Sequence, residues 1–315
     1  MTQTPIPVLA IVGPTASGKT ALSVEVAKRC SGEIISADSM QIYKGMDVAV
    51  ATPTEAEKQG IPHHMMGFLE PETPYSVAEY VKAAGACIHA VHAKGKLPMV
   101  VGGTGLYVDH LLSGTQFIET KTDSELRAKL ETDYEHLGGE KMLEQLAEFD
   151  AETAERLHPN NRKRILRAFE VYELTGDTMS AALRKSQEKP SPYAPTYLCI
   201  AYQNRDVLYD RINRRVDLML ENGLLEETRQ FYSHHSATAA QAIGYKELKP
   251  YVEGTCTLEA ATEHLKQATR HYAKRQMTWF KRNTAMHVLY ADVLSPQALI
   301  EQATQLAQPL LQVTP

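Results

Sequence analysis

The segment that most constrains this chain is GPTASGKT, which matches the phosphate-loop pattern G-x-x-x-x-G-K-[ST] throughout. The apolar run VLAIVG leads into it, as expected of a buried parallel strand, and ALSVEVAKRC follows with helical spacing. In this strand–loop–helix context, backbone amides, a lysine and the helix N-terminus bind a di- or triphosphate, although a chance match in a glycine-containing turn is the alternative. The predicted diphosphate-binding residues are Gly13, Pro14, Thr15, Ala16, Ser17, Gly18, Lys19 and Thr20. The Thr20 hydroxyl is the predicted metal ligand, for Mg²⁺.

Further strand signals alternate with helical segments along the chain. EIISADS from Glu33, LPMVVGGT from Leu97, a run near Tyr197–Tyr202 and MHVLYAD all read as strands. Strands that alternate with helices predict a parallel α/β sheet.

The character changes between about residues 122 and 189, where polar, helix-periodic segments carry almost no strand signal. The proline-rich stretch KPSPYAP then reads as a linker that returns the chain to a core strand. We therefore predict an α/β fold with a P-loop NTPase-like parallel sheet core and an inserted all-helical domain. The core comprises residues 1–116 and 195–315, and the insertion residues 117–194, with the active site between the two.

Length and composition exclude several classes of protein. A chain of 315 residues with 43% hydrophobic and 23% charged residues is long enough for two globular domains. The four cysteines form no CxxC pair, so we expect reduced thiols and not a zinc site or disulfide framework. No apolar run is long enough to span a membrane, and the start MTQTPIPV is not a signal pattern, which predicts a cytoplasmic protein with no membrane partner. A net charge of −5 gives no overall hint of nucleic acid.

Two loops follow strands at the edge of the sheet where the phosphate loop lies. Asp38 ends the second strand and could act as a Mg²⁺ ligand, a general base or a simple turn residue. The glycine-rich segment from Gly102 to Gly105 places the Thr104 hydroxyl near the phosphates, or is only a turn. The phosphate loop itself leaves open ATP or GTP binding with phosphoryl transfer, and a substrate whose leaving group is pyrophosphate.

Local clusters of cationic residues occur in the sequence although the net charge is negative. The segment from Arg162 to Arg167 is either a solvated helix face or an RNA contact. The helix from Lys266 to Arg282 has no acidic residue; we expect its cations to meet tRNA or diphosphate, and Met277, Trp279 and Phe280 to face the core. His63 and His64 have no partner at metal-ligand spacing, so a surface or packing role is expected.

Seven segments in this order closely resemble the tRNA dimethylallyltransferases, also called tRNA isopentenyltransferases. They are GPTASGKT, DSMQIYKGMDVAVATPT, VGGTGLY, NRKRILRAFEVYELTG, RINRRVDLMLENGLLEE, QAIGYKEL and YAKRQMTWFKR, from about Val8 to Arg282. The zinc-finger tail of eukaryotic relatives is absent, which favours a bacterial-type enzyme.

The resemblance implies a prenyltransferase of tRNA processing. It would transfer the dimethylallyl group of dimethylallyl diphosphate to N6 of adenosine 37 of tRNA, beside the anticodon, and release diphosphate. It implies Asp38 as general base, with Lys19 and Thr104 also catalytic, and Mg²⁺ as cofactor. The partners would be the anticodon stem–loop of tRNA and dimethylallyl diphosphate, bound by a monomer. The adenine must leave the base stack to react in a closed pocket.

The same resemblance implies the residues that contact tRNA. These are Asp38, Ser39, Met40, Gln41, Thr104, Arg127, Lys163, Arg164, Ile165, Leu166 and Arg167. Arg215 is a weaker candidate for the reaction channel, because an ion pair with Asp217 or Glu221 would also explain it.

Three other functions compete with this interpretation. A small-molecule or nucleotide kinase would use the same loop and clamp ATP with arginines. An adenylate isopentenyltransferase would prenylate a free nucleotide, but a small acceptor needs no long helical insertion. A tRNA-binding protein with a degenerate site is disfavoured by the intact Lys19, Thr20 and Asp38.

Overall fold

The computed structural model describes residues 4–115, 117, 123–187, 190–234 and 238–311. The chain divides into two compact units, one formed by Met1–Leu112 with Pro192–Pro315 and the other by Ser113–Ser191. Residue 116, where we expect the first core segment to end, lies outside the described residues.

The described part of the first unit contains one parallel sheet, with the strand order β3-β2-β4-β1-β5-β6. Its strands are β1 (Ile6–Val12), β2 (Gly32–Ser36), β3 (His63–His64), β4 (Leu97–Gly102), β5 (Tyr193–Ala201) and β6 (Met286–Tyr290). Every residue of β1 is buried, as the continuous apolar sequence of a central parallel strand requires. The predicted fold class is therefore confirmed.

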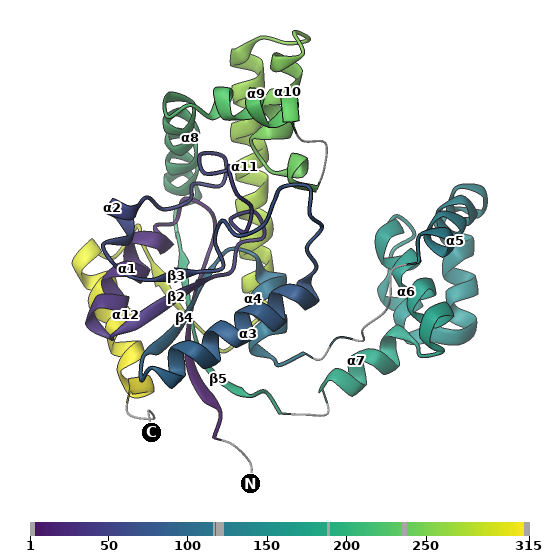
Figure 1. The fold of residues 1–315 in the computed structure, drawn as a ribbon, viewed down its shortest axis with the longest axis horizontal. Helices are drawn as coiled ribbons and strands as arrows, with labels where there is room; N and C mark the ends of the chain where they lie inside the picture. The colour runs from purple at the N-terminus through teal and green to yellow at the C-terminus, as the bar shows by residue number, and fades with distance from the viewer. Residues whose placement is uncertain (1–3, 116, 118–122, 188–189, 235–237, 312–315) are drawn as a thin grey trace. The chain divides into compact units, whose positions relative to one another are not determined.

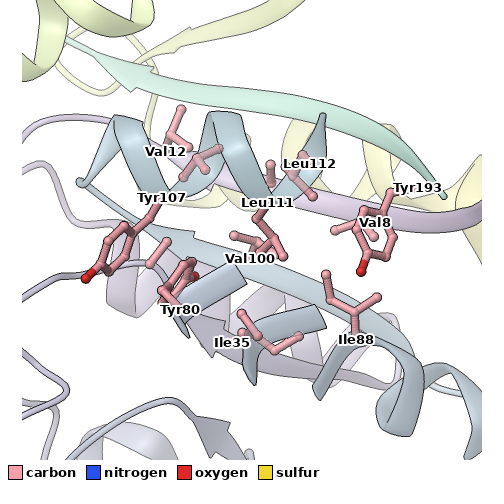
Figure 2. Packing of buried hydrophobic residues seen from close by; sticks show 14 of the residues in the cluster. Val8, Val12, Ile35, Tyr80, Ile88, Val100, Tyr107, Leu111, Leu112 and Tyr193 are labelled. Atoms are coloured by element: carbon pink, nitrogen blue, oxygen red, sulfur yellow. The ribbon is translucent and has the colours of Figure 1, made fainter. Parts of the chain in front are cut away.

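Helices cover both faces of the sheet (Figure 1). The helices α1 (Lys19–Arg29) and α12 (Pro296–Leu311) pack on one face, where Leu9 and Ile11 of β1 point. The helices α3 (Val77–Ala93) and α4 (Gly105–Leu112) pack on the other face. Figure 2 shows that second layer, in which side chains of β1, β2 and β4 meet Tyr80, Ile88 and Tyr107. Tyr80 and Tyr107 stack with ring centroids 3.9 Å apart.

The helices between β5 and β6 gather at one end of the sheet (Figure 1). They are α8 (Arg205–Glu221), α9 (Leu224–His234), the 3₁₀ helix η1 (Thr238–Gln241), α10 (Tyr245–Val252) and α11 (Leu258–Phe280). Their core includes Ile42, Tyr43 and Met46, which belong to the segment between β2 and the short helix α2 (Glu55–Lys58). This packing ties the end of β2 to helices about 200 residues later in the sequence.

Two details of the sheet differ from the sequence-based expectation. The two-residue strand β3 pairs with β2 but was not predicted, because two residues show no periodicity. Pro195, predicted to lie in a linker, is part of β5 and pairs in register with Val8. Proline fits there because β6 pairs only with Tyr197–Ala201, so the opposite side of β5 is an edge at Pro195.

The second unit is helical in its described part. It contains α5 (Ser124–Arg156), α6 (Arg162–Thr175) and α7 (Met179–Gln187). The helix α5 is interrupted at Gly138 and Asp150, where the backbone leaves helical geometry. Leu130, Met142, Leu146, Ile165 and Leu166 are at the centre of a separate core. None of the helices that the structure describes in either unit is long and apolar enough to cross a membrane.

A buried carboxylate supports the edge of the sheet near β3. Glu33 on β2 is 1% exposed and accepts hydrogen bonds from His64 (2.8 Å), Lys94 (3.1 Å) and Lys96 (2.8 Å). Burial alone would raise the pKa of Glu33, but these donors outweigh it and lower the pKa to about 2. The carboxylate is therefore charged at every pH at which the protein is expected to work.

The substitution Glu33→Gln should lower the free energy of unfolding by about 2 kcal/mol at pH 7. The pKa of Glu33 lies below the value of about 4.3 expected in the unfolded chain. Its stabilisation is consequently complete above about pH 4.5 and is lost as the pH falls towards 2. Urea unfolding followed by the fluorescence of Trp279, the one tryptophan of the chain, measures this in the first unit.

The matched control is Glu25→Gln, which removes the partially exposed ion pair with Lys28 and should change stability by less than about 0.5 kcal/mol. If Glu33→Gln lowered the free energy of unfolding equally at pH 7 and at pH 2.5, the ionic origin of the effect would be contradicted.

Candidate functional site

The phosphate loop joins β1 to α1 at the carboxyl end of β1. Gly13 has φ +144°, and a Cβ there would lie 2.5 Å from the carbonyl oxygen of Ile200 in β5. Gly18 has φ +91° and precedes α1 without a side-chain cap. The first amides of α1 therefore have no capping side chain and are available to bind an anion.

The ammonium of Lys19 folds back onto its own loop. Its Nζ donates to the carbonyl oxygens of Gly13 (3.0 Å) and Pro14 (2.7 Å). Burial, together with the nearby positive charge of Arg215, lowers the pKa of Lys19 to about 8, although Asp38 acts in the opposite direction. A bound anion would offset this cost, so the loop is built to receive negative charge.

Next to this loop lies a cavity of about 340 Å³. Its lining combines a charged and polar part with an apolar part, and every lining residue belongs to the first unit. The polar part includes Thr15, Lys19, Thr20, Asp38, Ser39, Gln41, His63, Arg215, Lys246, Thr269, Tyr272, Arg275 and Gln276. The apolar part includes Ile34, Met40, Ala49, Val50, Met66, Val216, Met219, Ala242, Ile243 and Leu265. Such a cavity suits a ligand with an anionic end and an apolar body.

The structure brings most of the predicted first-unit residues to this cavity. Thr15, Lys19, Thr20, Asp38 to Gln41 and Arg215 line it directly, whereas Thr104 stands behind the lining. The hydroxyl oxygen of Thr104 accepts a hydrogen bond from the amide of Ser39 (3.1 Å). Ser17 is buried, and its hydroxyl has no partner among the described residues.

Asp38 has the turn role that its position allowed. One carboxylate oxygen, Oδ1, accepts the amide of Met40 (2.9 Å) in a local turn. The other, Oδ2, has no hydrogen-bond partner among the described residues, and the side chain interacts electrostatically with both Lys19 and Arg215, which line the same cavity. The turn orients the carboxylate, so only one of its two oxygens is used within the protein.

Gln41 is used within the protein. Its Oε1 accepts from the Ser36 hydroxyl (2.8 Å), and its Nε2 points to the carbonyl oxygens of Val50 and Ala51 at 3.3 and 3.4 Å. It therefore holds the segment that forms one wall of the cavity.

Arg215 lies in the cavity wall and not on the helix surface. The alternative ion pair with Asp217 is not formed, because Asp217 pairs with Lys266 at 2.6 Å. Nor does Arg215 pair with Glu221 among the described residues. Arg215 thus contributes positive charge on the side of Asp38.

Two residues of this site were missed by sequence reasoning. Glu227 of α9 accepts the amides of Val48 and Ala49, both at 2.8 Å, and the hydroxyl of Tyr245 at 2.9 Å. Gln276 of α11 contacts the phosphate loop and the loop after β4. The loop residues that these two side chains contact are more than 170 residues away in the sequence. No local pattern could therefore identify Glu227 or Gln276.

The aromatic residues of α11 have two different environments, the core of the first unit and the cavity. Phe280 is 2% exposed, and Met277 and Trp279 pack against the same core, which confirms the expected core face. The indole of Trp279 donates to Asp109 (2.7 Å). Tyr272, in contrast, lines the cavity, and burial raises its pKa well above the ordinary value.

The two histidines differ: His64 has a structural role, whereas His63 lines the cavity and its Nε2 atom is buried with no hydrogen-bond partner among the described residues. His64 pairs with Glu33, and the Nδ1 atom of His63 lies 2.8 Å from the carbonyl oxygen of Ile61. No group of three or more His, Cys, Asp or Glu side chains among the described residues could hold a metal ion.

The cations of the second unit fall into two groups. Arg127 bridges Glu131 (2.9 Å) and Glu170 (2.8 Å), and Arg167 pairs with Glu170 at 3.3 Å. Lys163 and Arg164 are exposed and form no ion pair with any described residue. Together with Lys129 of α5, which is also exposed and forms no ion pair with any described residue, these side chains are the ones most available for a polyanion.

Two of the predicted tRNA contacts are corrected by burial. Ile165 and Leu166 are both 0% exposed, in the core of the second unit. Their side chains cannot reach RNA. They instead fix the helix that carries Lys163, Arg164 and Arg167 on its exposed side.

Comparison with known proteins gives a consistent result. The family model IPP transferase matches residues 41–283, and the model Isopentenyl transferase matches residues 6–66. A tRNA dimethylallyltransferase of Caldanaerobacter subterraneus is 47% identical over 91% of this chain and 92% of its own length. One from Bacillus licheniformis is 45% identical over 97% of this chain and 96% of its own.

Solved structures show the same similarity. The tRNA isopentenylpyrophosphate transferase of Bacillus halodurans aligns with a TM-score of 0.74 at 38% identity, covering 98% of this chain and 97% of that one. A second solved structure is that of a eukaryotic dimethylallyltransferase, described as acting on tRNA. It aligns with a TM-score of 0.86 at 28% identity and covers 98% of this chain and 80% of that one.

The pKa of Lys19 predicts a pH dependence of anion binding. Below about pH 8 the ammonium is already charged, whereas above it the ligand-free lysine is neutral and must take up a proton to bind an anion. The test is the dissociation constant for inorganic diphosphate, measured by calorimetry for the wild type and for Lys19→Arg. The ratio of the wild-type value to the Lys19→Arg value should rise by roughly tenfold between pH 7 and pH 9. The arginine stays charged, so the ratio cancels the titration of the ligand itself. A constant ratio would contradict the assignment.

Proposed function

This chain belongs to the IPP transferase family, and from this premise we propose how its cavity works. The protein is a tRNA dimethylallyltransferase: it transfers a dimethylallyl group to tRNA. We infer that dimethylallyl diphosphate binds with its diphosphate on the loop from Gly13 to Thr20, and that the acceptor is N6 of adenosine 37 in the anticodon stem–loop. The observation that carries this is the placement of Asp38 and Lys19 in one cavity of about 340 Å³.

The proposed reaction is a substitution at carbon. The N6 nitrogen forms a bond to C1 of the dimethylallyl group while the C1–O bond breaks, and the electron pair of that bond leaves with the diphosphate. Oδ2 of Asp38 accepts the N6 proton, which is needed because the N6 lone pair is delocalised into the adenine ring. Lys19, the α1 amides and Arg215 stabilise the charge that develops on the diphosphate.

The donor set of the cavity fits a magnesium ion held mainly by the substrate. Thr20 offers a hydroxyl in the lining, and no three-residue ligand cluster exists among the described residues that could hold an ion alone. A hydroxyl together with substrate phosphates is a common Mg²⁺ environment. When bound, the ion would neutralise charge on the diphosphate as it leaves.

We propose that the second unit binds the tRNA backbone through α6. The support is the exposure of Lys163 and Arg164 on a helix anchored by Ile165 and Leu166. Arg167, Arg127 and Thr104 remain proposed contacts, as do Asp38 to Gln41 for the extruded adenine. We further propose that the protein is a monomer and that it works in the cytoplasm.

The base assignment is tested with Asp38→Asn. Asparagine keeps the Oδ1 acceptor for the Met40 amide but cannot accept the N6 proton. We expect kcat for transfer of labelled dimethylallyl groups to unmodified tRNA to fall roughly 10²- to 10⁴-fold, with the affinity for inorganic diphosphate nearly unchanged.

Asp210→Asn, on the exposed surface of α8, is the matched control and should retain full activity. If Asp38→Asn lost diphosphate binding but kept its turnover when saturated, Asp38 would be a binding residue and not the base.

The RNA contact is tested with the double variant Lys163→Ala and Arg164→Ala. Each lost phosphate contact should weaken tRNA binding and lower the salt dependence of log Kd by about 0.7 to 0.9 per charge. We expect a rise of roughly tenfold or more in KM for tRNA, with KM for dimethylallyl diphosphate unchanged.

Lys141→Ala removes an equally exposed cation of the second unit that is paired with Glu144, and serves as the control. An unchanged salt slope in the double variant would place the tRNA elsewhere.

A further inference from the structure

A second, smaller pocket of about 160 Å³ lies beside the reaction cavity in the first unit. It is formed by the start of α10, with the residues just before it, and by one face of α11. Its lining comprises Ile243, Lys246, His264, Gln267, Ala268, His271 and Arg275. The proposed reaction uses neither histidine, nor the glutamine, so this pocket needs an explanation of its own.

The polar lining of this pocket consists of hydrogen-bond donors and cations, with no carboxylate. Among the described residues, His264, Gln267 and His271 have no hydrogen-bond partner, and Arg275 has no ion-pair partner. An imidazole, a side-chain amide and a guanidinium each offer an N–H group. Several such donors that converge without an acidic neighbour suit an anion, because hydrogen bonds to a charged oxygen are the strong ones.

The pocket is accessible to a large ligand. His264, Gln267, His271 and Arg275 recur at spacings of three and four along α11, so they share one face of that helix. All four are exposed. A polymer that lies on the surface of α11 can therefore reach them, whereas a buried structural network would be closed to it.

The pocket and the reaction cavity share a wall. Ile243, Lys246 and Arg275 line both of them. Lys246 and Arg275 are also exposed, so this shared wall lies where the cavity reaches the surface. A base that enters the cavity stays joined through its ribose to two backbone phosphates, which remain outside. These phosphates are the anions that the acceptor itself brings to this part of the surface.

We propose that this pocket binds one of the two backbone phosphates that flank the adenosine placed in the cavity, through His264, Gln267, His271 and Arg275. The proposal rests on the proposed function, because it takes an adenosine within RNA as the acceptor. A contact of this kind positions the nucleotide and reads no sequence. It gives the first unit a contact with RNA that is separate from the cations of α6.

The test removes the charge from one phosphate at a time. Two anticodon stem–loop RNAs carry a neutral methylphosphonate, one on the 5′ side and the other on the 3′ side of adenosine 37. Their affinities for the full chain are measured by fluorescence anisotropy without the prenyl donor. One of the two should bind the wild type roughly tenfold more weakly than unmodified RNA, about the effect of one hydrogen bond to a charged group.

The double variant His264→Ala and His271→Ala removes the donors of the pocket and leaves the reaction cavity intact. It should bind unmodified RNA roughly tenfold more weakly and should no longer respond to the methylphosphonate. KM for tRNA should rise by a similar factor, with kcat and KM for dimethylallyl diphosphate unchanged. Gln267→Ala should give the same pattern with a smaller factor, and it decides the test if the double variant does not fold.

His287→Ala is the matched control. It removes an exposed histidine of β6, which lines neither the pocket nor the cavity, and should leave every affinity unchanged. The proposal is overturned if neither methylphosphonate weakens binding to the wild type. It is equally overturned if the folded variants lose as much affinity for the modified RNA as the wild type does.

Failure of the proposed function has a different signature, because RNA binding is measured without transfer. If the methylphosphonate effect depends on the histidines while no label moves from dimethylallyl diphosphate to tRNA, the phosphate site stands and the proposed reaction falls. If label moves but the effect does not depend on them, the reaction stands and the phosphate site falls.

Discussion

The structure depends on the contacts that other elements make with the phosphate loop. Its amides must point at an anion, so its carbonyl oxygens and its outer side need other partners. Arg211 of α8 donates to the carbonyl oxygen of Ala16 (3.0 Å), and Gln276 of α11 accepts the amide of Thr15. Gly13 packs directly against the backbone of Ile200 in β5. The last third of the chain thus shapes a loop at its beginning.

The same helices also build the rest of the cavity. Glu227 of α9 binds the amides of Val48 and Ala49, and Arg215 of α8 adds positive charge opposite Asp38. Burial raises the pKa of Tyr245, whose hydroxyl donates to that same Glu227. The cavity therefore has one wall from the carboxyl ends of the strands and another from the helices between β5 and β6. The unit Ser113–Ser191 interrupts the chain, and the segments on either side of it still form one compact unit.

Sequence patterns predicted the elements whose causes are local. The phosphate loop, five of the strands and the helical character of the insertion follow from residue order, since buried parallel strands and amphipathic helices have recognisable periods. The pattern could not reveal β3, which has two residues, or the place of Pro195 in β5, which depends on where β6 ends. The family resemblance also placed Ile165 and Leu166 on an RNA contact, although their burial follows from the packing of α5 against α6.

By itself, the sequence determined that this protein is a phosphate-loop α/β enzyme of the tRNA dimethylallyltransferase family. The eight residues of the loop are contiguous, and the family segments keep their order. The tertiary structure decided what surrounds the loop: that Arg215 lines the same cavity as Asp38 and does not pair with Asp217, and that Gln276 and Glu227 belong to the site. These contacts join residues 170 to 261 positions apart, and only the packing of the helices on the sheet brings such residues within hydrogen-bond distance.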